Sequence, residues 1–163
     1  MEIIQATIKD IPTIQSLSNI VWPVTFAPIL TADQISYMMN MMYSSEALEK
    51  QIENDGHNYI LLKEGDNYVG YSSYQLNISD NTTKVHKIYV LPQAQGKGLG
   101  KLLIEYVANK AREEKNNILQ LNVNRYNKAL KFYEKLGFTI SYTEDIDIGN
   151  GFLMEDYVME MNL

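Results

Sequence analysis

The sequence predicts an α/β (α+β) fold in which a mixed, mostly antiparallel central sheet carries helices on both faces. In the middle and at the end of the chain, apolar residues alternate with a period of two, which is typical of half-buried strands. Near the start, and again after the glycine-rich stretch 95–100, they recur every three to four residues, as on amphipathic helices. The expected element order is β-α-α-β-β-β-α-β-α-β-β.

Length and composition limit the classes of protein that the chain can be. Its 163 residues suit a single domain spanning residues 1–163, and the net charge of −6 opposes a nucleic-acid partner, which needs a basic surface. Cysteine is absent and the only imidazoles are His57 and His86, which excludes disulfides, a cysteine nucleophile and a histidine-rich metal site. No apolar run approaches the roughly 20 residues that cross a bilayer, and the N-terminus lacks a signal-peptide pattern. We therefore expect a cytoplasmic protein with no metal, nucleic-acid or membrane partner.

The first third of the chain is expected to form a strand and two helices. Residues 3–8 alternate as a strand, and Asp10 is positioned to cap the helix that follows. Pro23 is expected to kink or end this helix, because proline removes a backbone donor. A second helix begins after Thr31, and a further helical turn is expected at residues 47–48.

The rest of the chain alternates between strands and helices. The predicted elements are antiparallel strands at 58–63, 68–77 and 84–92, a helix from residue 99, a strand at 117–123, a short helix between Asn127 and Gly137, and a hairpin of strands at 138–148 and 152–163.

The glycine-rich stretch joins a strand to a helix. Gly96, Gly98 and Gly100 stand directly before the apolar-periodic run of that helix. Backbone N–H groups at a helix N-terminus bind anions, and glycine lets the anion approach the backbone. The stretch therefore predicts a phosphate-binding loop.

Two common phosphate loops do not fit this stretch. The nucleoside-triphosphate loop needs Ser or Thr after its lysine, whereas Leu102 follows Lys101. The dinucleotide fingerprint needs an acidic residue at the end of the next strand, where Asn122 and Asn124 stand. A nucleotide-dependent enzyme is therefore disfavoured.

A third loop does fit. Gln95, Gly98 and Gly100 resemble the Q-x-x-G-x-G coenzyme A pyrophosphate loop of the GCN5-related N-acetyltransferases, the GNAT family. The segment "NKALKFYEKLGF", residues 127–138, looks like the second signature of that family. The resemblance extends over the whole order of elements. It implies a GNAT-like sheet, acetyl-CoA (coenzyme A) as cofactor, and acetyl transfer to a primary amine.

The resemblance also assigns cofactor contacts. Backbone groups of Ile88 and Val90 would bind the pantetheine arm, with the Val90 N–H facing the thioester oxygen. The cofactor-binding residues that we expect are Ile88, Tyr89, Val90, Gln95, Gly96, Lys97, Gly98, Leu99, Gly100, Lys101, Asn127 and Lys135.

Two side chains are candidates for catalysis. Tyr133 matches the tyrosine of the family that protonates the departing thiolate, with plain packing as the alternative. His86 is the candidate base, because alternation would place it on the strand face of Ile88 and Val90; a buried structural histidine is the alternative. Since no cysteine can carry the acetyl group, we expect direct attack of the amine in a ternary complex.

The acceptor site is expected between the first two helices and the last hairpin. Candidate substrate-binding residues are Trp22, Phe26, Tyr37 and Asp156, since rings and carboxylates both attract ammonium groups. Residues 21–39 also look loosely like spermine/spermidine acetyltransferases of the same family, which favours a polyamine or other small cationic amine. The alternatives are a Met- and Tyr-rich core beside a solvated acidic hairpin, a protein or peptide acceptor, and a catalytically silent acyl-CoA-binding sensor. A homodimer is also compatible with the sequence.

Overall fold

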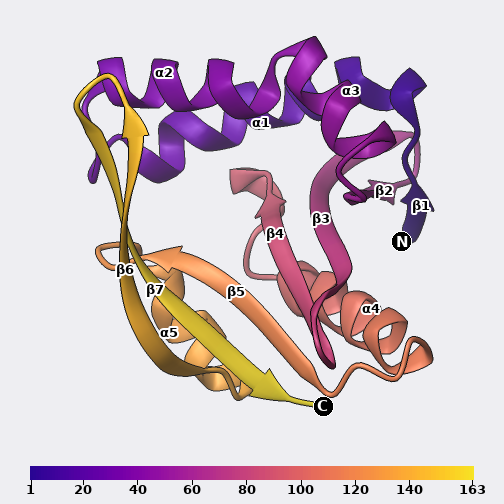
Figure 1. The fold of residues 1–163 in the computed structure, drawn as a ribbon. Coiled ribbons are helices and arrows are strands. Elements are labelled where there is room, and N and C mark those ends of the chain that lie inside the picture. Colours follow the sequence, from indigo (N-terminus) through magenta and orange to yellow (C-terminus); the bar gives the residue numbers. More distant parts are fainter.

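The computed structural model describes residues 1–163, and its strands and helices alternate along the chain (Figure 1). In chain order the elements are β1 (Glu2–Gln5), α1 (Ile11–Phe26), α2 (Ala32–Tyr43), α3 (Ser45–Glu53), β2 (Asn58–Glu64), β3 (Asn67–Ser79), β4 (Thr82–Val90), α4 (Leu99–Glu113), β5 (Ile118–Asn124), α5 (Ala129–Leu136), β6 (Thr139–Gly149) and β7 (Phe152–Asn162). The predicted order is confirmed, with one addition: α3 is a full helix where a single turn was expected. None of the helices is long and apolar enough to cross a membrane.

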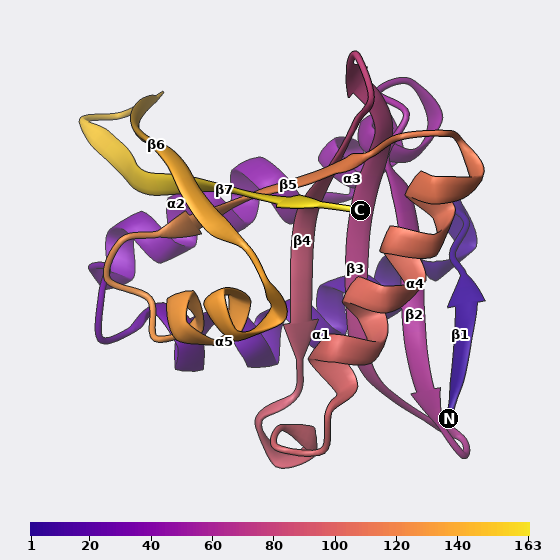
Figure 2. The same ribbon diagram turned by 90° about the horizontal axis from the view of Figure 1, so that it is seen from below.

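One seven-stranded sheet runs through the molecule in the order β1-β2-β3-β4-β5-β7-β6. Every neighbouring pair is antiparallel except β4 and β5, which confirms a mixed, mostly antiparallel sheet. Helices α1, α2 and α3 lie along one face, and α4 and α5 cover the other (Figure 2). Both faces are therefore buried, which explains why the central strands are apolar on both sides.

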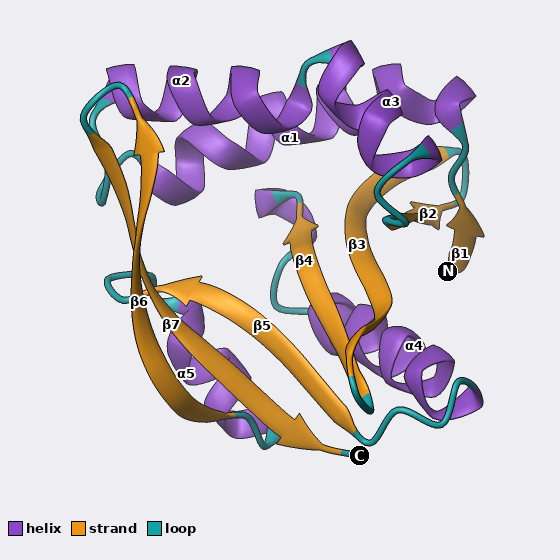
Figure 3. Cartoon of the chain, in the orientation of Figure 1, coloured by secondary structure: helices purple, strands orange, loops and turns teal.

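The parallel pair separates halfway along its length. β4 and β5 pair only between Thr82–Val85 and Ile118–Leu121. Beyond this point β4 continues to Val90 and β5 to Asn124, but the two strands no longer pair with each other and diverge (Figure 3). The backbone groups on the facing edges of the two strands are therefore left without sheet partners in the middle of the fold.

The prediction that Pro23 would kink or end the first helix included a helix end that the structure does not show. The helix continues to Phe26, and the Ala27 N–H still donates to the Pro23 carbonyl at 3.0 Å. A proline removes only its own donor from the helical ladder. The buried side chains of Val21 and Trp22 before it and Phe26 after it hold the last turn against the core.

Asp10 does not cap α1 either. Its carboxylate accepts a hydrogen bond from the Thr7 N–H at 2.8 Å, within a reciprocal cap of the short 3-10 turn Ile8–Asp10 that precedes the helix. The expected first strand is correspondingly shorter and stops at Gln5. Asp10 therefore caps the 3-10 turn before α1, and not α1 itself as the sequence pattern indicated.

A lysine is buried between the sheet and the helices without an acidic partner. The side chain of Lys87 in β4 is 7% exposed, and no salt bridge includes it. Its Nζ donates to Tyr59 Oη at 2.6 Å and to Gln51 Oε1 at 2.9 Å, and it lies 5.2 Å from the ring centroids of Tyr43 and Tyr59. Burial lowers the pKa of Lys87 to about 7. Its positive charge therefore opposes folding.

We expect Lys87→Met to raise the free energy of unfolding by about 2 kcal/mol at neutral pH. Below pH 7 the lysine is charged in both the folded and the unfolded state, so the cost of burying the charge is complete. Between pH 7 and 10.5 the folded lysine loses its proton first and the cost shrinks, and above pH 10.5 no cost remains. Tyr59 keeps its hydrogen bond to Gln51 at 2.6 Å in the variant.

Urea unfolding at several pH values would measure this effect, with the exposed Lys9→Met as the matched control. A gain that is independent of pH, or a loss of stability at pH 7, would contradict the account of Lys87 as an unpaired buried charge.

Candidate active site

The divergence of β4 and β5 opens a cavity of about 1010 Å³. Its walls come from β4, β5, α1, α2, α4, α5 and β7, so it reaches both faces of the sheet. One end is the glycine-rich loop before α4, and the other is enclosed by α1, α2 and β7. A single space of this kind can hold two molecules that enter from opposite faces of the sheet.

The loop before α4 presents a row of free donors. No backbone carbonyl or side chain accepts from the six consecutive N–H groups of residues 96–101. Gly96 and Gly98 have φ angles of +80° and +77°, a region that side chains disfavour, and Gly98 is the N-cap of α4. These N–H groups and the positive end of the α4 dipole fit a diphosphate group.

The third glycine serves packing. A Cβ atom on Gly100 would lie 3.0 Å from Cζ of Phe132 in α5. This position therefore leaves little room for a side chain, for a packing reason that is separate from phosphate binding.

The end of β4 offers backbone groups to the cavity. Leu91 N–H donates to the Val69 carbonyl of β3 at 2.8 Å. Because alternate residues of an antiparallel strand direct their backbone groups to opposite sides, Ile88 and Val90 direct theirs toward the side from which β5 has diverged. Gln95 Nε2 donates to the Val90 carbonyl at 3.0 Å, and the Val90 N–H is free because β5 no longer pairs with β4 at this point. This arrangement suits an extended amide-containing chain such as pantetheine.

Tyr133 borders the cavity from α5. It is 7% exposed and packs edge-on against the rings of Phe132 and Phe138, with centroids 5.1 and 5.8 Å away. No protein atom hydrogen-bonds its hydroxyl group. Burial raises its pKa, so the phenol keeps its proton at neutral pH. The group is thus available as a hydrogen-bond donor or acid inside the cavity.

The expectation that His86 shares a strand face with Ile88 and Val90 is wrong. A β-bulge sets Ser73 opposite Lys87 but Tyr74 opposite Val85, which leaves His86 as the extra residue. One inserted residue reverses the alternation on either side of it.

The imidazole of His86 still borders the cavity, but its partners lie on the Lys87 side of the sheet. It stacks on His57 at a centroid distance of 4.1 Å, and its Nε2 lies 3.0 Å from Gln75 Oε1. Burial, followed by the neighbouring His57, lowers the pKa of His86 to about 3. A ring with such a pKa is a weak base at neutral pH, which argues against His86 as the general base. That role stays a prediction.

We expect His86→Ala to lower kcat/KM by less than about tenfold and to leave the acidic limb of the pH–rate profile in place. A general base typically contributes a factor of 10² or more, which a ring with a pKa of about 3 cannot supply. Steady-state rates between pH 5 and 9 would measure this. A loss of 100-fold or more together with loss of the acidic limb would restore His86 as the base.

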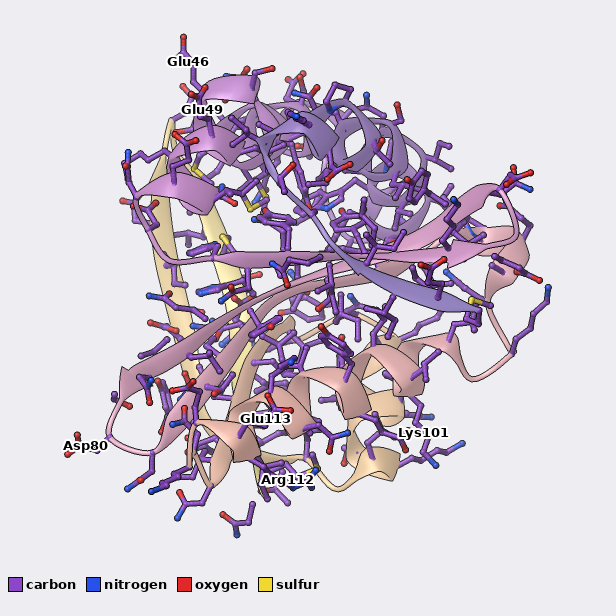
Figure 4. All side chains as sticks on the ribbon, turned by 90° about the vertical axis from the view of Figure 1, so that its right-hand side faces the viewer. Glu46, Glu49, Asp80, Lys101, Arg112 and Glu113 are labelled. Atoms are coloured by element: carbon purple, nitrogen blue, oxygen red, sulfur yellow. The ribbon has the colours of Figure 1, made fainter.

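The remaining expected cofactor residues line the cavity, with one exception. Lys101, in the first turn of α4, borders it and projects outward at the end of the helix opposite to Arg112 and Glu113 (Figure 4). Lys135 also lines the cavity, whereas Lys97 is exposed and does not. The complete set of expected cofactor residues at the cavity is Ile88, Tyr89, Val90, Gln95, Gly96, Gly98, Leu99, Gly100, Lys101, Asn127 and Lys135. Asn127 Oδ1 also accepts the N–H of Ala129, the first residue of α5, at 2.9 Å, one position before the N-cap Lys128.

At the acceptor end the structure brings three of the four expected residues to the cavity. Trp22 and Phe26 line it with their rings 4.3 Å apart, and Asp156 borders it from β7. Tyr37 does not line it: its hydroxyl donates to the Ile148 carbonyl at 2.6 Å. Tyr37 therefore ties α2 to the β6–β7 hairpin.

Several residues at the cavity have no clear signal in the sequence. Lys87 and Asn122 look like ordinary strand residues, and Met38, Met42 and Met154 look like general core. They reach the cavity because β4 and β5 diverge and because the hairpin folds back over α2, neither of which a local pattern reports.

The fold and the cavity agree with comparisons to known proteins. Residues 26–161 match the family model described as an acetyltransferase (GNAT) domain. PaiA N-acetyltransferase from Thermoplasma acidophilum, solved in complex with coenzyme A, superimposes with a TM-score of 0.84 at 23% identity, over 99% of this chain and 98% of that one. The chain therefore belongs to the GNAT family, and it is an acetyl-CoA-dependent N-acetyltransferase.

Other relatives differ in the acceptor that their names state. The 5-NmdU N-acetyltransferase of Pseudomonas phage PaMx11 is 35% identical over 102 residues, covering 62% of this chain and 67% of its own. A spermidine N-acetyltransferase chimera of Vibrio cholerae and hSSAT has a TM-score of 0.68 at 18% identity, over 99% of this chain and 96% of that one. Likeness to the spermidine enzyme shows the fold alone, so membership of the family leaves the acceptor undetermined.

Proposed function

We propose that this chain transfers the acetyl group of acetyl-CoA to the primary amine of a small molecule, with both substrates bound in the cavity at once. The observation that carries the proposal is the continuity of the cavity from the free N–H groups of residues 96–101 to the α1–α2–β7 end. The chain has no cysteine to carry an acetyl group, which supports direct attack by the amine.

Each end of the cavity has a distinct task. When bound, acetyl-CoA supplies an acetyl thioester, whose carbonyl is open to attack by a neutral amine. The N–H groups of residues 96–101 bind its diphosphate, and the Val90 N–H polarises the carbonyl oxygen. Tyr133 delivers a proton to the sulfur as it leaves.

The enclosure of the acceptor end supports a small acceptor over a peptide. Gln34 Nε2 in α2 donates to the Leu153 carbonyl of β7 at 2.7 Å, and Tyr37 makes a second bond from α2 to the hairpin. These bonds hold α2 against β6 and β7, which limits the room for a peptide chain at this end. The uncommitted hydroxyl of Tyr133 supports catalysis over a silent sensor.

Initial velocities with acetyl-CoA and a panel of small amines test the proposal. We expect turnover with intersecting double-reciprocal plots, and parallel plots would contradict direct attack. Coenzyme A binding without turnover of any amine would favour a sensor. Turnover restricted to peptide N-termini or lysine side chains would favour a protein acetyltransferase.

A further inference from the structure

The acceptor end of the cavity contains little negative charge. Of the 39 residues that line the cavity, only Asp156 carries a carboxylate. The other charged or titratable groups that line the whole cavity are His86, the lysines Lys87, Lys101, Lys128 and Lys135, and the tyrosines Tyr89, Tyr126 and Tyr133. An acceptor with several positive charges would find a single anion to bind.

Three other acids of the β6–β7 hairpin, Asp145, Asp147 and Glu155, are engaged outside the cavity, and Glu144, which does not line it, shares the Asn122 amide with Asp156. Arg125 pairs with Asp145 and lies 3.8 Å from Glu155. Asp147 accepts the Gly149 N–H at 2.9 Å and so orders the hairpin turn. These carboxylates therefore do not form the acidic surface that a polyamine would need.

The walls around the acceptor end are mostly apolar. They consist of Val21, Trp22, Val24, Phe26, Pro28, Ile29, Leu30, Met38, Met42, Leu153 and Met154. Thr25 and Gln34 are the polar exceptions on α1 and α2, and Gln34 already donates to Leu153. Methionine side chains adapt to irregular apolar shapes, so this end suits a hydrocarbon or aromatic body.

Asp156 has a partner that leaves acceptor atoms available. Its side chain is 3% exposed, and its Oδ2 accepts from Asn122 Nδ2 at 3.1 Å. The same Nδ2 group also donates to Glu144 Oε2 at 3.3 Å, which fixes the orientation of the amide, because a flipped amide would set oxygen against two carboxylates. Asn122 Oδ1 is buried without a hydrogen-bond partner. An ammonium group at Asp156 can supply the missing donor.

Asp156 also lies near the proposed acid. Asp156, Tyr133 and Tyr89 all line the same cavity. Burial, and after it the charge of Glu144, raises the pKa of Asp156, which makes it a better proton acceptor than an exposed aspartate. An amine at Asp156 is thus within the same part of the cavity as Tyr133.

We propose that the acceptor is a primary amine with one positive charge on an apolar body, and that its ammonium group binds Asp156 and Asn122 and gives a proton to Asp156. This inference rests on the proposed function. The neutral nitrogen forms the N–C bond to the acetyl carbonyl and then loses its second proton, the C–S bond breaks, and the thiolate takes a proton from Tyr133. The second proton from the nitrogen restores the Tyr133 phenol through solvent, and Asp156 releases the first proton to solvent after the products leave.

The first test uses the wild-type protein and amines of matched length. We expect hexylamine and phenethylamine to have kcat/KM values at least tenfold above those of 1,6-diaminohexane and spermidine, because a second buried ammonium group has no partner. Calorimetry with each amine in the presence of coenzyme A, where no transfer occurs, should show the same order of affinity. Higher activity and tighter binding with spermidine would overturn the inference while leaving the proposed function in place, whereas no turnover of any amine would remove both.

The second test compares Asp156→Asn with Glu155→Gln, which removes a charge from the adjacent hairpin position outside the cavity. We expect Asp156→Asn to lower kcat/KM by at least about 100-fold and to abolish amine binding, with coenzyme A affinity unchanged. Glu155→Gln should stay within about twofold of wild type in kcat/KM, in amine affinity and in coenzyme A affinity. Amine binding that survives in Asp156→Asn would overturn the assignment, and if this variant does not fold, the amine series on the wild-type protein decides.

Discussion

Tyr133→Phe is expected to lower kcat about 100-fold, while KM for the amine, the affinity for coenzyme A and the melting temperature stay close to those of the wild type. The lost interaction is made as the thiolate leaves, so it affects the rate and not substrate binding. General acid catalysis typically contributes 10²–10⁴-fold, and a thiolate leaves fairly well unprotonated, so about 100-fold is the appropriate end of the range.

The structure explains why stability should not change in this variant. The Tyr133 hydroxyl has no protein partner to lose, and phenylalanine keeps the contacts with Phe132 and Phe138. Because burial raises the pKa of Tyr133, kcat of the wild type should show no basic limb from this group below about pH 10. Full activity with a lowered melting temperature would instead identify Tyr133 as a structural residue.

Gly98→Val is expected to weaken coenzyme A binding by about 100-fold in a protein that still folds. The φ angle of Gly98 is +77°, so any side chain there strains the backbone that orients the free N–H groups of the loop. An added Cβ would meet no protein atom within 4 Å, so the fold has room for the side chain, and Gly98 itself lines the cavity. The loop would thus lose both its geometry and its access.

Gly65→Val is a matched control for this prediction. Gly65 has a φ angle of +60° and also has no atom within 4 Å of an added Cβ, but it lies in the β2–β3 turn, away from the cavity. Both variants should lose a similar amount of stability, about 1–2 kcal/mol for one strained residue. Isothermal calorimetry with coenzyme A should separate them, and equal affinities for the two variants would show that the loop does not bind the cofactor.

Local patterns were enough to predict two segments that the structure brings to one end of the cavity. The loop of residues 95–100 and the helix of residues 127–137 each carry their geometry in a few residues, because glycine is needed at positive φ and a capping side chain is needed before a helix. Gly98 at the N-cap of α4 and Gly137 at the end of α5 both adopt the left-handed conformation. The chain order of the elements followed from hydrophobic periodicity.

The acceptor end depended on features that no short pattern contains. A single extra residue in β4 changed the face of His86, and the register that creates it belongs to the pairing with β3. Tyr37 was predicted to bind substrate because it is aromatic, but in the structure its hydroxyl donates to the Ile148 carbonyl of the hairpin. Asp156 was the hairpin acid assigned to substrate, and in the structure it lines the cavity whereas Asp145 and Glu155 lie beside Arg125.

The contact of Gly100 with Phe132 has a consequence for how this enzyme can change. Two segments separated by a helix and a strand meet where a Cβ atom would lie 3.0 Å from the Phe132 ring, and the next residue after that ring is Tyr133. A larger residue at position 100 would push on the helix that holds the phenol before it disturbed any phosphate contact. The two signatures therefore pack against each other, and a redesigned loop with a larger residue at position 100 is expected to need a compensating change at Phe132 to keep Tyr133 in place.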